Sequence, residues 1–197
     1  MPANTLPCKK AIIAVAGFGT RRLPITKALE KCMLPVGDRP AIDYVVEDCL
    51  KAGIEEIIFV VGEEFQQLKR FYGHNQLLEE YLEDKGKTQE LQAIQALANK
   101  AHFQFVVQDQ HQPYGTSVPV WLCRHLIKPD ERVLVVFGDQ FFYREDGSSE
   151  IASFLQKGRS QSPFGHVGCA RALGRRIQIR HCGDYRARRT RTIPGNR

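Results

Sequence analysis

A glycine-rich stretch early in the chain, A-G-F-G-T-R-R at Ala16–Arg22, has residue types suited to holding an anion. Glycine lets the backbone adopt positive φ and approach a ligand closely, and successive backbone N–H groups can then surround a phosphate. Arg21 adds a forked cation that matches phosphate oxygens, and Lys31 adds a mobile point charge further along. The pattern predicts phosphate binding, although Gly17 and Gly19 alone fit a plain tight turn equally well.

Several common catalytic and cofactor motifs are excluded. Arg22 stands where the dinucleotide fingerprint G-x-G-x-x-G needs its third glycine, and the phosphate loop G-x-x-x-x-G-K-[ST] is not found. The sequence also contains no G-x-S-x-G, no H-x-x-x-H and no C-x-x-C. Serine-nucleophile chemistry and metal-dependent hydrolysis therefore have no support.

The elements that must position these residues alternate between two patterns. Short apolar runs ending near glycine predict buried parallel strands, and segments with apolar residues three to four positions apart predict amphipathic helices. We expect strands at 11–16, 57–61, 103–107 and 133–137, and helices at 39–52, within 64–100, at 117–126 and at 148–157.

This alternation predicts an α/β fold: a Rossmann-like three-layer α/β/α sandwich with a mostly parallel sheet, incomplete on its C-terminal side. The crossovers are long enough for parallel pairing and should be right-handed. Ligands bind such sheets beyond the carboxyl ends of the strands. Here those ends are Gly17, Gly62, the loop 108–115 and the pair Gly138-Asp139.

Asp139 directly follows the fourth predicted strand. A carboxylate at that end of a strand, facing a polyphosphate, is a hard oxygen ligand suited to Mg²⁺. The alternative is an aspartate that only stabilises a turn or a helix start. The nearby glycine-rich loop favours the metal ligand.

The longer string around the glycines resembles G-x-G-T-R-x-x-P-x-T-…-P-K-x-x-L-P, the signature of the sugar-1-phosphate nucleotidyltransferases. The sequence departs from it at Glu30, where that family usually has proline, and this change is expected to loosen the turn that presents Lys31. The resemblance covers roughly residues 9–162. The matching residues are Gly17, Gly19, Thr20, Arg21, Pro24, Thr26, Lys31, Leu34 and Pro35.

Within that family, T-K-A-L-E-K-C-M-L-P at Thr26–Pro35 and the helical insert Phe71–His102 look most like the bacterial UTP–glucose-1-phosphate uridylyltransferases. The loop that receives uracil in that group reads Q-x-x-P-x-G-x-G-H. Gln110 and Gly115 match its glutamine and first glycine, whereas Ser117 and Val118 replace its second glycine and its histidine.

The resemblance implies transfer of UMP from UTP to glucose-1-phosphate, giving UDP-glucose and pyrophosphate with Mg²⁺ as cofactor. Arg21 and Lys31 would be catalytic and Asp139 would bind the metal. The partners implied are UTP and glucose-1-phosphate, with neither nucleic acid nor a membrane, and the full-length family allows a homo-oligomer. The nucleotide-binding residues implied are Ala16, Gly17, Gly19, Thr20, Gln110 and Gly115.

The net charge of +6 is unevenly distributed. Residues 1–165 carry 19 Lys and Arg against 21 Asp and Glu, whereas residues 166–197 carry nine Arg against one acid, Asp184. The basic character therefore belongs to the end of the chain, and the body is slightly acidic. A net charge of this origin does not by itself indicate nucleic-acid binding.

We therefore predict two regions: 1–162 as the nucleotide-binding part of a nucleotidyltransferase domain, and 163–197 as an aberrant or disordered Arg-rich tail. The tail could be a basic arm for RNA or membranes, or the product of a one-base slip near residue 162. When Ala170–Gly183 is back-translated with permitted codons and read one base later, it contains the family's V-x-x-Y-G. The chain would then be truncated or frameshifted and would lack part of the sugar site.

The six cysteines have no metal-like spacing and the N-terminus has no apolar signal core, which predicts reduced thiols and a cytoplasmic protein. Cys49 and Cys123 lie in apolar contexts and are expected in the core. Two other functions stay open: a thymidylyl- or other sugar-1-phosphate nucleotidyltransferase, and a non-catalytic nucleotide-binding fragment.

Overall fold

The structure is a computed structural model. It describes residues 8–109, 111 and 115–157, and further on only the backbone of three strands: β7 (Val167–Leu173), β8 (Arg176–His181) and β9 (Arg191–Ile193). The uracil-loop residue predicted at Gln110 lies outside the described residues.

A central sheet organises the molecule, with strand order β5-β4-β1-β6-β7-β8-β9. The first four strands pair in parallel, and β1 lies between β4 and β6. Their interior residues are almost wholly apolar, as expected for strands covered on both faces. The four predicted strands are confirmed as β1 (Lys10–Ala14), β4 (Glu56–Val61), β5 (His102–Val107) and β6 (Arg132–Phe137).

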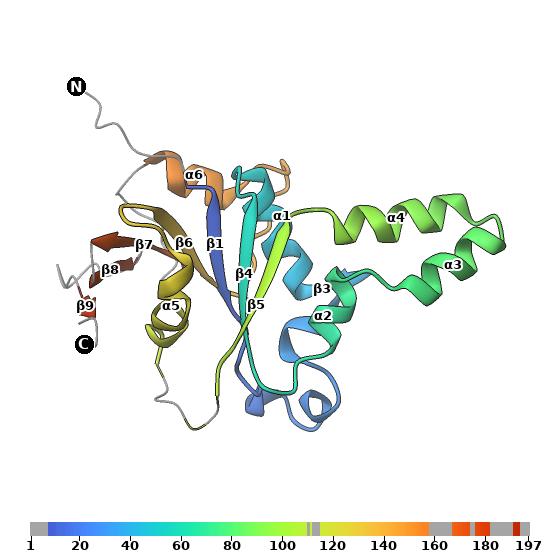
Figure 1. Cartoon of the computed structure of the whole chain (residues 1–197), viewed down its shortest axis with the longest axis horizontal. Coiled ribbons are helices and arrows are strands. Elements are labelled where there is room, and N and C mark those ends of the chain that lie inside the picture. Colours follow the sequence, from blue (N-terminus) through green and yellow to red (C-terminus); the bar gives the residue numbers. More distant parts are fainter. Residues whose placement is uncertain are drawn as a thin grey trace.

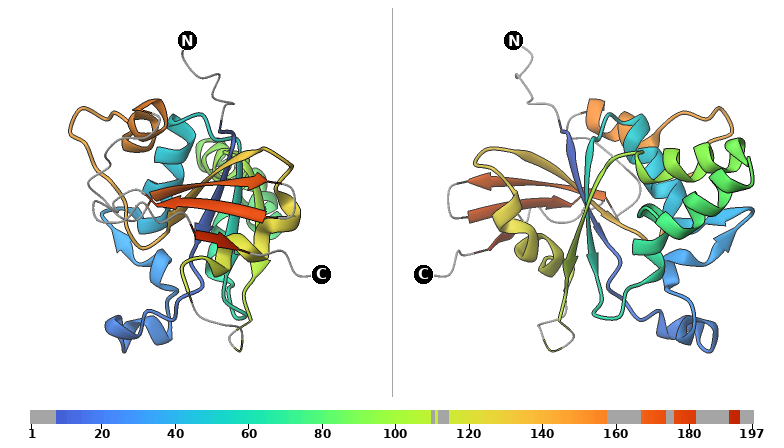
Figure 2. Two further views of the ribbon diagram at one scale, coloured as in Figure 1. Left: turned by 90° about the vertical axis from the view of Figure 1, so that its left-hand side faces the viewer. Right: turned by 45° about the vertical axis from the view of Figure 1, so that its right-hand side comes forward.

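Helices cover both faces of this sheet, which confirms the predicted three-layer sandwich (Figure 2). Ile13, Phe59 and Leu134 point to one face, where they pack with residues of α1, α2 and α6. Ile12 and Ile58 point to the opposite face, under α5 and the turn that follows it. These helices are α1 (Ala41–Lys51), α2 (Gln67–Tyr72), α6 (Glu150–Lys157) and α5 (Val118–Leu122), continued by the 3-10 turn η4 (Cys123–Leu126).

Two of the predicted cysteines mark the two halves of the core. Cys49 on α1 and Cys123 at the start of η4 are both fully buried, as expected. Burial raises the pKa of the Cys123 thiol to about 12. Both residues therefore act as small apolar core groups.

The segment between α2 and β5 forms a helical hairpin that extends away from the sheet (Figure 1). Its helices are α3 (Gln76–Asp84) and α4 (Thr88–Ala98). The Asn75 side chain caps the N-terminus of α3 by accepting a hydrogen bond from the N–H of Leu78 at 3.2 Å. Gly86, with φ of 65°, lies in the break between the helices, where the sequence predicts one.

Strands β7, β8 and β9 extend the sheet with antiparallel pairing, beginning with β7 beside β6. These strands were not expected from the sequence, although Ile177 and Ile179 alternate with polar residues along β8. The predicted boundary at residue 162 and the predicted origin of the residues after it stay predictions.

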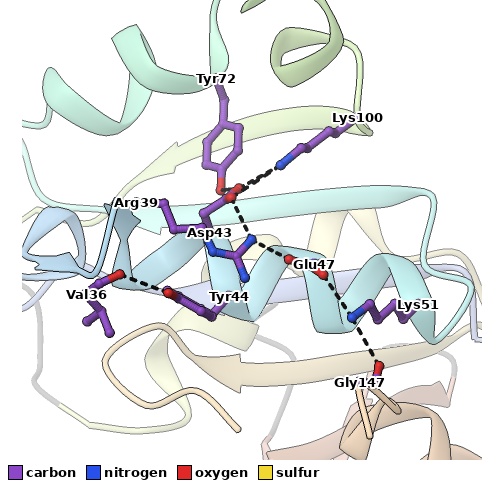
Figure 3. Close-up of polar contacts among 9 residues, drawn as sticks. All are labelled: Val36, Arg39, Asp43, Tyr44, Glu47, Lys51, Tyr72, Lys100 and Gly147. Atoms are coloured by element: carbon purple, nitrogen blue, oxygen red, sulfur yellow. Dashed lines mark hydrogen bonds and ion pairs between the residues drawn. The ribbon is translucent and has the colours of Figure 1, made fainter. Parts of the chain in front are cut away.

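The carboxylate of Asp43 on α1 is buried and contacts side chains from other segments (Figure 3). Asp43, whose side chain is only 6% exposed, accepts hydrogen bonds from the Tyr72 hydroxyl at 3.0 Å and the Lys100 ammonium at 3.1 Å. Arg39, in the short strand β3 (Arg39–Pro40) that precedes α1, contacts the same carboxylate at 3.3 Å. Burial, together with the Asp43 charge, raises the pKa of Tyr72 well above its ordinary value. Three separate segments are thereby tied to one side chain.

Arg39 continues this network along α1 by pairing with Glu47, which also pairs with Lys51 at 2.9 Å. The Lys51 ammonium in turn donates to the carbonyl of Gly147 at 3.2 Å, as Figure 3 shows. The hydrogen bonds from Lys51 and Arg39 lower the pKa of Glu47 to about 2. This chain of charges links α1 to the loop that leads into α6.

Candidate functional site

The glycine-rich loop leaves β1 at the carboxyl end of the sheet and folds back in tight turns. Gly19 has φ of 65°, a conformation that side chains rarely adopt. A Cβ placed on it would lie 3.0 Å from both Lys31 Cβ and Thr26 Cγ2. The Thr26 hydroxyl also donates to the carbonyl of Gly19 at 3.0 Å. The sequence thus needs glycine here because the loop packs directly onto the segment that carries Lys31.

Three short 3-10 turns carry the loop: η1 (Thr20–Arg22), η2 (Ile25–Lys27) and η3 (Lys31–Met33). Most of the loop is exposed, but Cys32 in η3 is 4% exposed and belongs to the core. Burial raises the pKa of the Cys32 thiol to about 12, so it is an anchor and not a nucleophile. Lys31 is thereby fixed on one side by a buried neighbour.

The structure brings two predicted site residues into direct contact. The Lys31 ammonium lies 2.6 Å from Oδ2 of Asp139, and the two side chains are 35% and 41% exposed. Lys31 comes from the loop after β1 and Asp139 follows β6, the parallel neighbour of β1. Parallel pairing places the carboxyl ends of β1 and β6 side by side, and the turns of the loop bring Lys31 back to that edge.

Gly138 sets the position of Asp139. A Cβ at Gly138 would lie 2.3 Å from Val15 Cγ1 and 2.9 Å from Ile42 Cδ1. Only glycine therefore lets the chain leave β6 so close to β1 and α1. The close packing around Gly138 therefore fixes the backbone from which Asp139 extends.

Arg21 occupies η1 and is exposed. Within the described part of the chain its side chain makes no hydrogen bond or ion pair, so the guanidinium is available to an anion. Gly17 is also exposed, and a Cβ on it would meet no protein atom within 4 Å. The protein's own packing does not require glycine there. Ala16, before these glycines, is half-buried, and Thr20, after them, is exposed.

The predicted base-contacting glycine, Gly115, lies after β5 in the bend that leads into α5, where its carbonyl accepts from the N–H of Val118 at 3.1 Å. The carboxyl end of β5 is joined to β4 by a bond from the Gln108 N–H to the Val61 carbonyl at 2.8 Å. No contact joins Gly115 to Lys31 or Asp139 among the described residues.

Glu30 differs from the sequence-based expectation of a loosened turn. Its carboxylate Oε1 accepts hydrogen bonds from the backbone N–H groups of Gln66 and Gln67, both at 2.6 Å. The turn before Lys31 is therefore held by a side chain in place of the conformational restriction that proline would supply. The departure from proline is visible in the sequence, whereas the hydrogen bonds of the carboxylate depend on the fold.

Asp139 is also the residue here best placed to hold a metal. Across residues 8–109, 111 and 115–157 no cluster of three or more His, Cys, Asp or Glu side chains could hold an ion. Mg²⁺ commonly takes one or two protein carboxylates and completes its shell with water and substrate phosphates. A single exposed aspartate at this edge fits a Mg²⁺ ion that is bound together with a polyphosphate.

An open cavity of about 600 Å³ adjoins Asp139. Arg144 on its wall is already paired with Glu150, which it contacts from Nε at 2.6 Å, so this cation is partly neutralised. The residues that line the cavity are Asp139, Gln140, Phe141, Phe142, Tyr143, Arg144 and Glu150. The exposed carboxylate therefore borders both the glycine-rich loop and a hollow large enough for a small molecule.

These features together can bind a phosphorylated ligand: a glycine loop at a strand end, an unpaired guanidinium, an ammonium and a carboxylate that suits Mg²⁺. The sequence model of the family described as Nucleotidyl transferase matches residues 10–170, which is most of the chain. The chain belongs to this family. The resemblance seen in the glycine-rich loop is confirmed.

Within this family, the chain is similar to one curated protein and to two solved structures. The UTP–glucose-1-phosphate uridylyltransferase of Bacillus subtilis strain 168 is 35% identical over 186 residues, covering 88% of this chain and 63% of its own length. A UTP-bound UGPase from Acinetobacter baumannii has a TM-score of 0.70 at 32% identity, covering 76% of this chain and 52% of its own. A UDP-glucose pyrophosphorylase complexed with UDP-glucose has a TM-score of 0.60 at 30% identity, with coverages of 76% and 54%.

The nucleotidyl transferase chain thus spans less than two thirds of the length of each of these proteins. Its described helices include none long and apolar enough to cross a membrane.

Proposed function

We propose that the chain forms the nucleotide-binding part of a UTP–glucose-1-phosphate uridylyltransferase, which transfers UMP from UTP to glucose-1-phosphate and releases pyrophosphate. The observation that carries the proposal is the contact between Lys31 and Asp139 at the carboxyl ends of β1 and β6. A cation and a metal-type carboxylate meet there beside a glycine-rich loop. The relatives named for UTP, UDP-glucose and uridylyl transfer support this choice of substrate.

In the proposed reaction, an oxygen of the sugar phosphate attacks the α-phosphorus of UTP in line, and pyrophosphate leaves. No covalent bond to the protein is needed, so the protein's work is to position the phosphates and to stabilise charge. Arg21, which is exposed and unpaired among the described residues, would hold the triphosphate and stabilise the leaving pyrophosphate. Lys31 would contact phosphate oxygens near the reacting phosphorus.

The remaining roles follow from position. The backbone of Ala16, Gly17, Gly19 and Thr20 would surround the nucleotide, and Gly17 leaves open space for close approach. Gln110 and Gly115 would contact uracil. Asp139 would hold Mg²⁺, which supplies Lewis-acid stabilisation of phosphate charge when it is bound.

The proposal extends to organisation and location. We assign residues 1–162 to the nucleotide-binding part and place the protein in the cytoplasm, where its four described cysteines, all buried and none in a disulfide, would stay reduced. For residues 163–197 we propose a reading frame shifted by one base near residue 162. Resequencing the gene across codons 155–197 tests this directly: an uninterrupted native frame over Gln161–Gly183 rules it out.

Two assays on the purified chain test the function. Titration with UTP and with dTTP in the presence of Mg²⁺ compares the bases, and pyrophosphate release is then followed with UTP, glucose-1-phosphate and Mg²⁺. Preference for UTP together with release supports the uridylyltransferase. Preference for dTTP points to a thymidylyltransferase. UTP binding without release identifies a nucleotide-binding fragment.

A further inference from the structure

The Glu30 carboxylate caps a helix that lies far from it in sequence. Its Oε1 accepts from the N–H groups of Gln66 and Gln67, and its Oε2 accepts from the N–H of Leu68 at 3.3 Å. The first N–H groups of a helix have no partner within the helix, and Gln66 at the start of α2 gives no side-chain cap. Glu30 therefore supplies from outside what α2 lacks at its own N-terminus, where a negative charge is also favoured by the helix dipole.

The link is reciprocal. The Gln67 side chain accepts from the backbone N–H of Glu30 at 2.9 Å and donates to the carbonyl of Ala28 at 2.9 Å. Five hydrogen bonds thus join the segment 28–30 to the first turn of α2. This resembles the two-way exchange of a capping box, with the two partners on separate segments.

This link has a rigid support. Leu68 and Tyr72 of α2 are buried in the same core cluster as Phe59 of the sheet. Glu30 is followed directly by Lys31, whose ammonium contacts Asp139. The core therefore holds the Lys31 backbone from two sides: through the buried Cys32 that follows Lys31, and through α2 and the Glu30 hydrogen bonds that precede it.

We propose that Glu30 is a positioning residue: by capping α2 it fixes the segment that presents Lys31 to the phosphates, a role that rests on the proposed function. Glu30 does so without touching the substrate. Its backbone, with φ of −57° and ψ of 132°, already has dihedral angles that proline can adopt. The hydrogen bonds of Glu30 in this chain and the proline ring in the family pattern therefore restrain the same turn by different means.

The first test uses hydrogen–deuterium exchange and needs no ligand. Glu30→Ala is compared with Glu79→Ala, a matched control in which a carboxylate at the start of α3 accepts from the Asn75 N–H at 3.1 Å. In Glu30→Ala the amides of residues 28–34 and of the first turn of α2 should exchange faster, while β1 and β4 stay protected. Unchanged exchange over residues 28–34 overturns the proposal, whether or not the chain binds UTP.

The second test measures UTP affinity by calorimetry in the presence of Mg²⁺. We expect Glu30→Ala to weaken binding by about tenfold and Glu79→Ala to match the unmodified chain. Glu30→Pro should bind more tightly than Glu30→Ala, because its ring restricts the turn, but less tightly than the unmodified chain, because it lacks the N–H that donates to Gln67. Adding Glu30→Ala to Lys31→Ala should cost no further affinity, because Glu30 acts through Lys31. Independent, multiplying losses in the double variant overturn the positioning role.

The two tests separate the two proposals. If the unmodified chain fails to bind UTP, the proposed function is wrong, and the exchange experiment still decides whether Glu30 holds the Lys31 segment. If UTP binds but Glu30→Ala binds it equally well, the proposed function stands and the role of Glu30 is wrong. Glu30→Gln, which keeps one acceptor oxygen, gives an intermediate variant if Glu30→Ala fails to fold.

Discussion

The Lys31 ammonium and the Asp139 carboxylate meet at 2.6 Å although 108 residues separate them in the chain. Both side chains are more than a third exposed, and exposed ion pairs contribute only about 0–1 kcal/mol to stability. The pair therefore contributes little to the free energy of unfolding. The contact instead places an ammonium and a carboxylate together beside the glycine-rich loop.

Removing either cation of the loop should abolish function without unfolding the protein. Lys31→Ala and Arg21→Ala each delete a positive charge that faces phosphate in the proposed reaction, and such losses commonly cost about 10²–10³ in rate. The measurements are UTP affinity, pyrophosphate release and circular dichroism. Arg22→Ala removes an exposed neighbouring charge and serves as the control, which should stay close to the unmodified chain. Undiminished binding and release in either Lys31→Ala or Arg21→Ala would contradict the assigned roles.

Two glycine-to-alanine changes should have opposite effects. In Gly138→Ala the new methyl group would overlap Val15 and Ile42, so we expect a loss of about 1–3 kcal/mol in the free energy of unfolding. In Gly17→Ala the methyl group meets no protein atom, so stability should stay within about 0.5 kcal/mol while UTP binding weakens. Urea denaturation and UTP titration measure both. A stable Gly138→Ala protein would show that the close approach of β6 to β1 is not as described.

The Asp43 network should contribute strongly to stability. Asp43→Ala leaves the buried Tyr72 hydroxyl and the Lys100 ammonium without their shared partner, and we expect a loss of about 3 kcal/mol. Tyr72→Phe removes one hydrogen bond to a charged group and should cost about 1.5–3 kcal/mol. Denaturation by urea gives both values. Asp84→Ala, at the exposed end of α3, is the control; an Asp43→Ala loss as small as that control's would refute this account.

Glu47 should stabilise the protein except in acid. Because its pKa is lowered from the ordinary 4.5 to about 2 in the folded state, its contribution is fully present above pH 4.5 and is lost as pH falls toward 2. The difference in Tm between the unmodified chain and Glu47→Gln should therefore be largest near neutral pH and shrink across that window. The exposed Glu64→Gln should show no such trend. A difference independent of pH would mean that packing, and not charge, explains the effect.

Most of the sandwich follows from local patterns in the sequence. Two-sided apolar runs such as 57–61 can be satisfied only in a covered parallel sheet, and β4 lies at 56–61. The helical spacing over 39–52 likewise gives α1 at 41–51. Strands β7 to β9 were not predicted in this way. Only β8 alternates, with Ile177 and Ile179 between polar residues, and each of these strands pairs with a neighbour that lies elsewhere in the chain pattern, beginning with β7 beside β6.

Some features of the candidate site could likewise be predicted from the sequence, and others could not. The sequence predicts Lys31 and Asp139 as site residues near the carboxyl ends of β1 and β6. Their direct contact was not predicted, because it depends on the three 3-10 turns that fold the loop back from β1. The capping role of Glu30 could not be predicted, since it depends on where Gln66 and Gln67 lie in space. The one signal available was its departure from the proline of the resembling family. A side chain that breaks a motif can replace the lost restraint through contacts that only the folded chain reveals.

Strand β1 lies between β4 and β6, and this has a consequence for the order of folding. During synthesis, β1, β4 and β5 are complete once residue 107 has been made, whereas β6 begins only at residue 132. A nascent chain of the shorter length carries the glycine-rich loop but not Asp139. Under the proposed function, a ligand that contacts both Lys31 and Asp139 stabilises chains in which β6 has paired with β1 more than it stabilises shorter, partly folded chains.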